Sequence, residues 1–171
     1  MSLQDTVTKQ YVSDPKVFAD AFNYLIYDGE QIIRPEQLTD LDATQFAIPY
    51  REEEEGKPEA TQKYRDVLKT LAVKTDDQRA YLVLGIENQS NVHYAMPVRN
   101  MLYDAMQYEK QVRQLAAAHR KKHDAATSDE YLSGMSREDK ITPVITLVIN
   151  FGSKKWDGPL SLHEMMNEHP P

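Results

Sequence analysis

The feature that most constrains the fold is a strand-like run, RAYLVLGIENQS at residues 79–90, which is apolar at first and then ends in polar residues. An apolar run of this length, with Tyr81, Leu82, Val83, Leu84 and Ile86, is typical of a strand in the interior of a sheet. Glu87 follows the apolar part directly, and Gln89 comes two residues later. Because an unpaired carboxylate inside a sheet is costly to desolvate, we expect Glu87 to lie at the end of the strand and to meet a cation.

A second candidate strand precedes this run and predicts a second acid beside Glu87. Residues 61–72 fit a strand or a helix, and TDDQ at residues 75–78 fits a turn that leads into the apolar run. Two runs joined by a short turn predict an antiparallel hairpin. Asp66 and Glu87 are each about ten residues from the centre of the turn, so the hairpin would place their carboxylates face to face.

Facing acids suggest a metal site. Two close carboxylates repel each other, and one would stay protonated unless a divalent cation lies between them. Mg²⁺ prefers oxygen ligands and keeps several waters, one of which it can activate for attack on a phosphate. Gln89 shares the strand face of Glu87 and could hold that water or a phosphate oxygen. The simpler alternative is that Asp66 pairs with a nearby Arg or Lys at the surface while Glu87 caps the sheet edge.

Two helices and a further strand complete the predicted fold, which is of the α/β (α+β) class. Residues 13–29 begin with capping residues and a proline and end in a glycine, which predicts a helix. A longer helix should begin near Pro97 and lie on the sheet through an apolar stripe. The stripe consists of Val98, Met101, Ala105, Tyr108, Val112 and Leu115. The β-branched run at residues 141–152 predicts a second buried strand, and the order of elements predicts a small mixed sheet flanked by helices.

Composition narrows the class of protein. The chain of 171 residues has no cysteine, which excludes disulfides and zinc–thiolate sites. It has no apolar run near the roughly 18 residues that a membrane span needs. The net charge of −7 means that the surface as a whole does not favour nucleic acid. We therefore expect a cytoplasmic protein that binds no membrane and needs a metal ion or a local basic patch to bind an anionic partner.

The length is sufficient for one domain with its own core. We expect this domain to cover residues 13–166, after a disordered or weakly ordered N-terminus at residues 1–12 and before a short tail at residues 167–171. Within the domain, the polar segment 119–140 should be a mobile insertion that follows a basic helix end.

Several ordered stretches of the chain resemble a known nuclease family. They are FADAFNYLIYDGE, YRDVLK, LGIENQSNVHYAMPVRNMLYDA and PVITLVINFGSKKWDGPLSLHEMM, and the match extends from about residue 14 to residue 166. The layout resembles the Rpn-type recombination-promoting nucleases, also described as YhgA-like transposases, of the PD-(D/E)XK nuclease superfamily. The resemblance implies a restriction-endonuclease-like αβββαβ core. It also implies a DNA endonuclease that depends on Mg²⁺, with Mn²⁺ able to replace it, and that is linked to recombination or mobile elements.

The resemblance also implies roles for individual residues. Asp66 and Glu87 match the two acids that ligate Mg²⁺, together with the backbone carbonyl of Asn88. Gln89 stands where the superfamily usually has lysine, although related nucleases tolerate glutamine there. Asp20, on the first predicted helix, matches an acid that often supplements the site. The missing positive charge at residue 89 favours an alternative function, a catalytically weak or inactive nuclease fold that serves in interaction or oligomerisation.

One face of the long helix is a candidate for binding DNA. Arg99, Tyr103 and Gln107 are spaced by four and should line up along this face. Arg99 would either contact a phosphate or pair with Glu87. Exposed methionine and tyrosine side chains of the chain could instead bring two copies together as a homodimer.

The run AHRKKH near the end of that helix has more than one interpretation. Arg120, Lys121 and Lys122 could form the local positive patch that DNA binding needs. His119 and His123 are four apart and could hold a metal ion between them on a helix. A solvated basic helix end is the simpler interpretation of the same residues.

Overall fold

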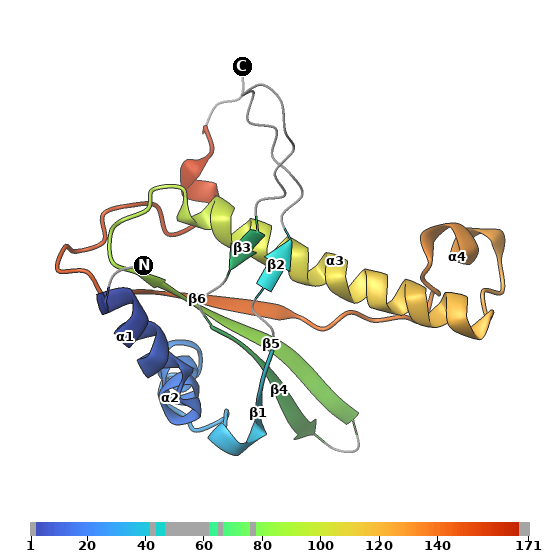
Figure 1. The fold of residues 1–171 in the computed structure, drawn as a ribbon, viewed down its shortest axis with the longest axis horizontal. Coiled ribbons are helices and arrows are strands. Elements are labelled where there is room, and N and C mark those ends of the chain that lie inside the picture. The colour runs from blue at the N-terminus through green and yellow to red at the C-terminus, as the bar shows by residue number, and fades with distance from the viewer. Residues whose placement is uncertain (1–2, 42–43, 47–61, 65–66, 76–77, 168–171) are drawn as a thin grey trace.

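Helices pack on both faces of a mixed sheet, which confirms the predicted mixed α/β class (Figure 1). The structure is a computed structural model that describes residues 3–41, 44–46, 62–64, 67–75 and 78–167. The helices are α1 Leu3–Ser13, α2 Pro15–Ile26, α3 Met96–Lys122 and α4 Ser128–Ser133, with short 3₁₀ turns η1 Pro35–Gln37 and η2 His163–Met165. The strands are β1 Leu38–Asp40, β2 Thr44–Phe46, β3 Gln62–Tyr64, β4 Val67–Thr75, β5 Gln78–Gln89 and β6 Val144–Asn150.

The sheet is built on the hairpin that the sequence predicts. Its strand order is β1–β4–β5–β6, in which β1 and β5 are antiparallel to β4 and β6 is parallel to β5. The β4–β5 ladder runs from the pair Thr75–Gln78 to the pair Val67–Ile86, so residues 67–72 are strand rather than helix. β2 and β3 form a separate antiparallel pair. β5 is therefore paired on both sides, as expected for the most apolar strand of a sheet.

The main core lies between α2 and one face of the sheet. Phe18 and Phe22 of α2 are fully buried, with ring centroids 5.1 Å apart, and they cluster with Ile86 of β5 and Leu147 of β6. Each such side chain contributes about 1.5–3 kcal/mol when it leaves water. The predicted start of this helix is confirmed, because the Asp14 side chain accepts hydrogen bonds from the first backbone amides.

The N-terminus is more ordered than its sequence indicates. We expect residues 1–12 to be weakly ordered, but Leu3–Ser13 form α1. Val12 is only 1% exposed and belongs to the same core cluster as Phe18. A mostly polar helix that is anchored near its end has little apolar periodicity, so pattern analysis does not detect it. The sequence pattern therefore did not predict α1 in the part of the N-terminus that the structure describes.

The long helix α3 begins where the sequence predicts, yet it turns a partly different face to the sheet. The stripe expected against the sheet is exposed or only half-buried, and Val98 and Met101 are 40% and 52% exposed. Tyr103 and Gln107, on the neighbouring polar face, are 1% and 4% exposed. Counting apolar residues assigns this polar face to solvent, whereas tyrosine and glutamine can be buried once their polar groups find partners. The predicted contact face of α3 is therefore right only in part: Tyr108 of the stripe accepts a hydrogen bond from the amide of Val144 on β6 at 3.1 Å, whereas Val98 and Met101 stay exposed.

Residues 119–140, where the sequence predicts a mobile insertion, complete α3 and form α4 at its far end (Figure 1). α3 continues to Lys122, and after α4 the chain turns at Gly134, which has a left-handed φ of 72°. A Cβ on Gly134 would lie 2.6 Å from the Cβ of Ala116, so glycine allows the segment to pack directly on α3. Helix caps and the close packing of Gly134 on Ala116 hold this segment in place. Neither kind of contact requires apolar residues at regular intervals in the sequence.

A buried asparagine ties α2 to the chain that follows it. Asn23 is fully buried, its side-chain amide donates to the carbonyl of Ile33, and its side-chain oxygen accepts from the amide of Ile33, both at 2.8 Å. We expect Asn23→Ala to lower the free energy of unfolding by about 2–4 kcal/mol, because two buried backbone groups lose their partners. Denaturant titration measures this loss. Asn167→Ala changes an exposed asparagine and is the matched control; equal stability of the two variants would refute this role of Asn23.

Candidate functional site

The polar end of β5 lies inside the sheet and not beyond it. Residues 87–89 pair with residues 148–150 of β6 in parallel register. Gln89 is 9% exposed, and its backbone carbonyl accepts a hydrogen bond from the amide of Phe151 at 2.8 Å. β6 therefore pairs with the backbone of β5 along the whole polar end of that strand, which consists of Glu87, Asn88 and Gln89.

The predicted pair of acids is only partly within the described structure. Asp66 lies outside the described residues, and of Glu87 and Asn88 the backbone is described but the side chain is not. Val67, the residue after Asp66, pairs with Ile86, the residue before Glu87. Across the residues that are described, no three His, Asp or Glu side chains are placed to hold a metal ion together. The magnesium ligands therefore stay a prediction.

The register shows on which face of the sheet the side chains near the C-terminal ends of β5 and β6 lie. Ile86 packs in the core on the α2 face. Side chains alternate along a strand, so Gln89 and its register partner Asn150 belong to the opposite face. α3 covers that face, because the Thr146 hydroxyl donates to the carboxylate of Asp104 on α3 at 2.7 Å. Gln89 is therefore a residue of the α3 face.

Asp20 does not join this face. It is exposed on α2, which packs on the other side of the sheet from α3. The residues that α2 buries are Phe18, Ala19, Phe22 and Asn23. The structure does not bring Asp20 together with Gln89, so the role of a supplementary acid in the site gains no support.

Arg99 and Tyr103 form a polar pair on the buried side of α3. The Nε of Arg99 donates to the hydroxyl of Tyr103 at 3.0 Å, and the guanidinium carbon lies 5.5 Å from the centre of the ring. Gln107 follows one turn later and is also buried. A buried tyrosine thus orients a half-buried guanidinium, whose planar fork suits phosphate or carboxylate oxygens. The spacing of these three residues predicted their alignment correctly.

A cavity of about 220 Å³ opens beside this face, between the start of α3, β6 and the loop after it. Its walls are Met96, Pro97, Asn100, Val148, Asn150, Trp156, Pro159 and Leu160. Val148 and Asn150 are the register partners of Glu87 and Gln89, so the cavity adjoins the predicted site. Among the described residues, Asn100 has a buried Oδ1 without a hydrogen-bond partner. Sequence reasoning missed both asparagines, and the one available signal was that a polar residue ends the β-branched run of β6.

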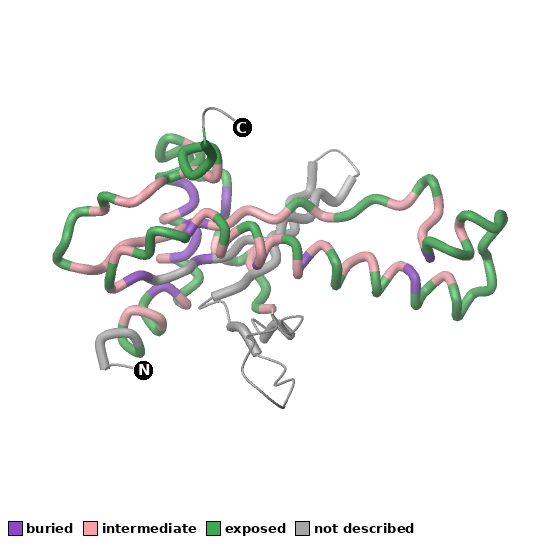
Figure 2. The backbone as a smooth tube through the Cα atoms, turned by 90° about the horizontal axis from the view of Figure 1, so that it is seen from above, coloured by how far each residue is buried: buried purple, intermediate pink, exposed green. Residues whose placement is uncertain are grey.

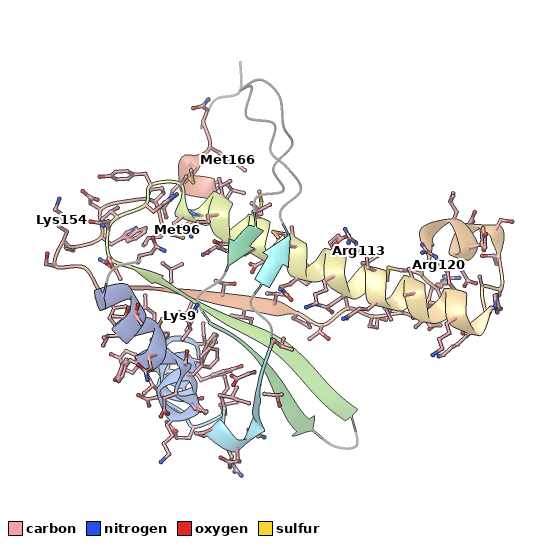
Figure 3. All side chains as sticks on the ribbon, viewed as in Figure 1. Lys9, Met96, Arg113, Arg120, Lys154 and Met166 are labelled. Carbon is pink, nitrogen blue, oxygen red and sulfur yellow. The ribbon has the colours of Figure 1, made fainter. Side chains whose placement is uncertain are left out.

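The basic residues lie far from this site. Figure 3 places Arg120 at the distal end of α3, beside α4. At a rise of 1.5 Å per residue, Arg99 and Arg120 are about 30 Å apart along the helix. Arg120, Lys121 and Lys122 are exposed, but the five Lys and Arg side chains of residues 119–140 are matched by five Asp and Glu side chains. The predicted positive patch is therefore small and remote from β5.

His119 is held by two carboxylates. Its Nδ1 lies 2.6 Å from Oδ1 of Asp124, and its Nε2 lies 2.8 Å from Oδ2 of Asp139. Only the protonated imidazole has a donor at both nitrogens, and these two hydrogen bonds raise the pKa of His119 above 6.5. The bond to His119 lowers the pKa of Asp124, and the amide of Ser136 is the main cause of the lowered pKa of Asp139. Both ring nitrogens are therefore engaged, which leaves neither for a metal shared with His123.

This ion-paired histidine predicts that the stability of residues 119–140 depends on pH. The charged His119 contributes stability that is complete below pH 6.5 and is lost as the pH rises through its raised pKa. The two acids contribute stability above pH 3.8, and they lose it as the pH falls through their lowered pKa values. We therefore expect the segment to be most stable between pH 3.8 and 6.5.

An NMR titration can follow this change at the amide of Ser136, which donates to Asp139 at 2.7 Å. We expect its signal to move in a single transition above pH 6.5, where His119 loses its proton. His119→Gln should abolish the transition, whereas His163→Gln, at an exposed position of η2, should leave it in place. Persistence of the transition in His119→Gln would show that another group causes it.

Comparison of the chain with family models, with curated proteins and with solved structures found no match. Within the described ranges, no helix combines the length and the apolar character that crossing a membrane requires. The function is therefore inferred from the residues and their geometry.

Proposed function

We propose that the protein is a DNA endonuclease that depends on Mg²⁺, with Mn²⁺ able to replace it, and that its core is restriction-endonuclease-like. The order α2, β1, β4, β5, α3, β6 follows the αβββαβ succession that the resemblance to the Rpn-type nucleases implies, with the β2–β3 pair inserted after β1. The mixed strand directions and the polar end of β5 add to this support.

The observation that carries the proposal is the register at the start of β4. Val67 pairs with Ile86, and we propose that the pairing continues by one residue so that Asp66 faces Glu87. Residues directly opposite in an antiparallel pair have Cβ atoms about 4.5–5.5 Å apart, which allows two carboxylates to reach one cation. These acids and the carbonyl of Asn88 supply the oxygen ligands that Mg²⁺ prefers.

In this proposal the residues of the α3 face position the substrate. Bound Mg²⁺ would lower the pKa of a bound water and offset the negative charge that develops on the phosphate. Gln89 holds the attacking water or a phosphate oxygen through its amide, which has no role as an acid or a base. Arg99, oriented by Tyr103, contacts a phosphate oxygen. These roles require no proton transfer by the glutamine that stands in place of lysine.

Plasmid nicking tests the proposal. In Mg²⁺ the chain should convert supercoiled plasmid to open circles, and EDTA should stop the reaction. Asp66→Asn and Glu87→Gln should each lower the rate at least about 100-fold. Loss of a residue that only hydrogen-bonds to a metal ligand already lowers metal affinity or activity about 10–100-fold, and these two residues are the proposed ligands themselves. Glu36→Gln, at an exposed position of η1, is the matched control. Nicking by Asp66→Asn at the wild-type rate would remove Asp66 from the site.

An inactive module for protein interaction is the second candidate, and the exposed apolar side chains of α3 and α4 favour it. Cation binding separates the two functions. A protein with the metal site gains about 2.7 kcal/mol of stability when Mg²⁺ is present at 100 times its Kd. A module without the site gains none. An unchanged melting temperature in Mg²⁺ and Mn²⁺, together with intact plasmid, would favour the interaction module over the nuclease.

A further inference from the structure

The cavity at the start of α3 suits one small uncharged ring system. Its volume of about 220 Å³ is below the roughly 300–1,000 Å³ of pockets that enclose a drug-sized ligand. Of the described residues that line it, all except two asparagines are apolar and none is charged. A phosphate or another ion would lose its hydration there without gaining an opposite charge, whereas a neutral ring loses little.

Trp156 supplies the large aromatic part of the cavity wall. Its ring nitrogen donates a hydrogen bond to the carbonyl of Gly158 at 2.9 Å, so this contact sets the orientation of the indole. A tryptophan ring that is held in this way offers a surface on which another flat ring can stack.

The loop that carries Trp156 is held close to the end of β5. Gly152 lies so near the carbonyl of Ser90 that a Cβ would not fit between them. The side chain of Asn150 accepts from the amide of Gly152 at 3.0 Å and donates to the carbonyl of Lys154 at 2.9 Å. The chain's own contacts therefore build this wall, and they place it beside the strand end at which the proposed nuclease site lies.

Asn100 gives the cavity a hydrogen-bonding group that lacks a partner. Its Oδ1 is buried and is not hydrogen-bonded to any described residue, a state that costs stability. The last side-chain torsion of asparagine is soft, so a small rotation turns the amide into the cavity that Asn100 lines. There the amide can accept from one N–H group and donate through its own nitrogen. The ring that fits the cavity should therefore carry hydrogen-bonding groups along its edge.

The loop around Trp156 leaves the cavity within reach of a ligand. None of residues 151–162 is buried, and Figure 2 shows intermediate and exposed positions along this loop. Lys154 and Lys155 are exposed directly before Trp156, and Asp157 is the one acid among residues 150–159. This small excess of positive charge next to an aromatic ring suits the phosphates on either side of a bound base.

We propose that the cavity binds one unpaired base of the DNA strand that the nuclease site holds. The base stacks on Trp156, and its edge forms hydrogen bonds with the amide of Asn100. A base enters a pocket only when it belongs to a single strand or has left the stack of a duplex. The choice of DNA as the ligand rests on the proposed function, and the cavity adds the form of DNA that the site takes.

Tryptophan fluorescence tests the cavity, because Trp156 is the one tryptophan of the chain. We expect a short single-stranded DNA to quench this fluorescence in EDTA, where metal-dependent cleavage plays no part. A strand of the same length without bases, and a stable duplex of the same sequence, should quench little. An unchanged signal with the single strand, or equal quenching by the base-free strand or the duplex, would overturn the proposal.

Asn100→Leu tests the amide. Leucine is similar in size but forms no side-chain hydrogen bond, so we expect this variant to bind the single strand about 10-fold or more weakly. Its melting temperature should not fall, because the substitution removes a buried oxygen that has no partner. Asn167→Leu, at an exposed asparagine outside the cavity, is the matched control. An affinity of Asn100→Leu equal to that of the control would overturn the proposal.

Fluorescence and plasmid nicking separate this inference from the proposed function. Quenching by single strands without nicking in Mg²⁺ would retain the base-binding cavity and refute the nuclease. Nicking without quenching would retain the nuclease and refute the base-binding cavity.

Discussion

The pairing of β5 with a neighbour on each side is the constraint on which the rest of the structure depends. Ile86 pairs with Val67 of β4 and with Leu147 of β6, and it is fully buried against α2. Because side chains alternate along a strand, burial of Ile86 on the α2 face assigns Gln89 to the α3 face, and a slip of one residue would reverse both. The polar end of β5 is thus positioned by the packing of its apolar part.

Elements that bury apolar side chains at regular intervals could be predicted from the sequence. Capping and periodicity predict α2, the β4–β5 hairpin, β6 and the start of α3, and their order predicts the mixed α/β class that the structure has. The orientation of α3 could be predicted only in part, because Tyr103 and Gln107 are buried on a face that apolar counting assigns to solvent. α1 left no pattern either, since Val12 anchors a mostly polar helix near its end.

The candidate site was predictable to a smaller extent. The spacing of Arg99 and Tyr103 places them on one helix face, and their hydrogen bond follows from that. Asn100 and Asn150 line the adjoining cavity, but a polar residue on a helix or at a strand end does not reveal which cavity it lines. The helix α4 was also missed, because it is held by short-range caps at Thr127 and Gly134. Such contacts have no period that a sequence can display.

The central claim is that two acids on neighbouring strands share one metal ion at the α3 face. Anomalous scattering from crystals soaked in Mn²⁺ locates such an ion directly. We expect one peak at about 2.0–2.2 Å from the carboxylates of Asp66 and Glu87, with the carbonyl of Asn88 as a further ligand. A saturating soak that gives no peak between these acids, or a peak elsewhere on the chain, would contradict the proposed site.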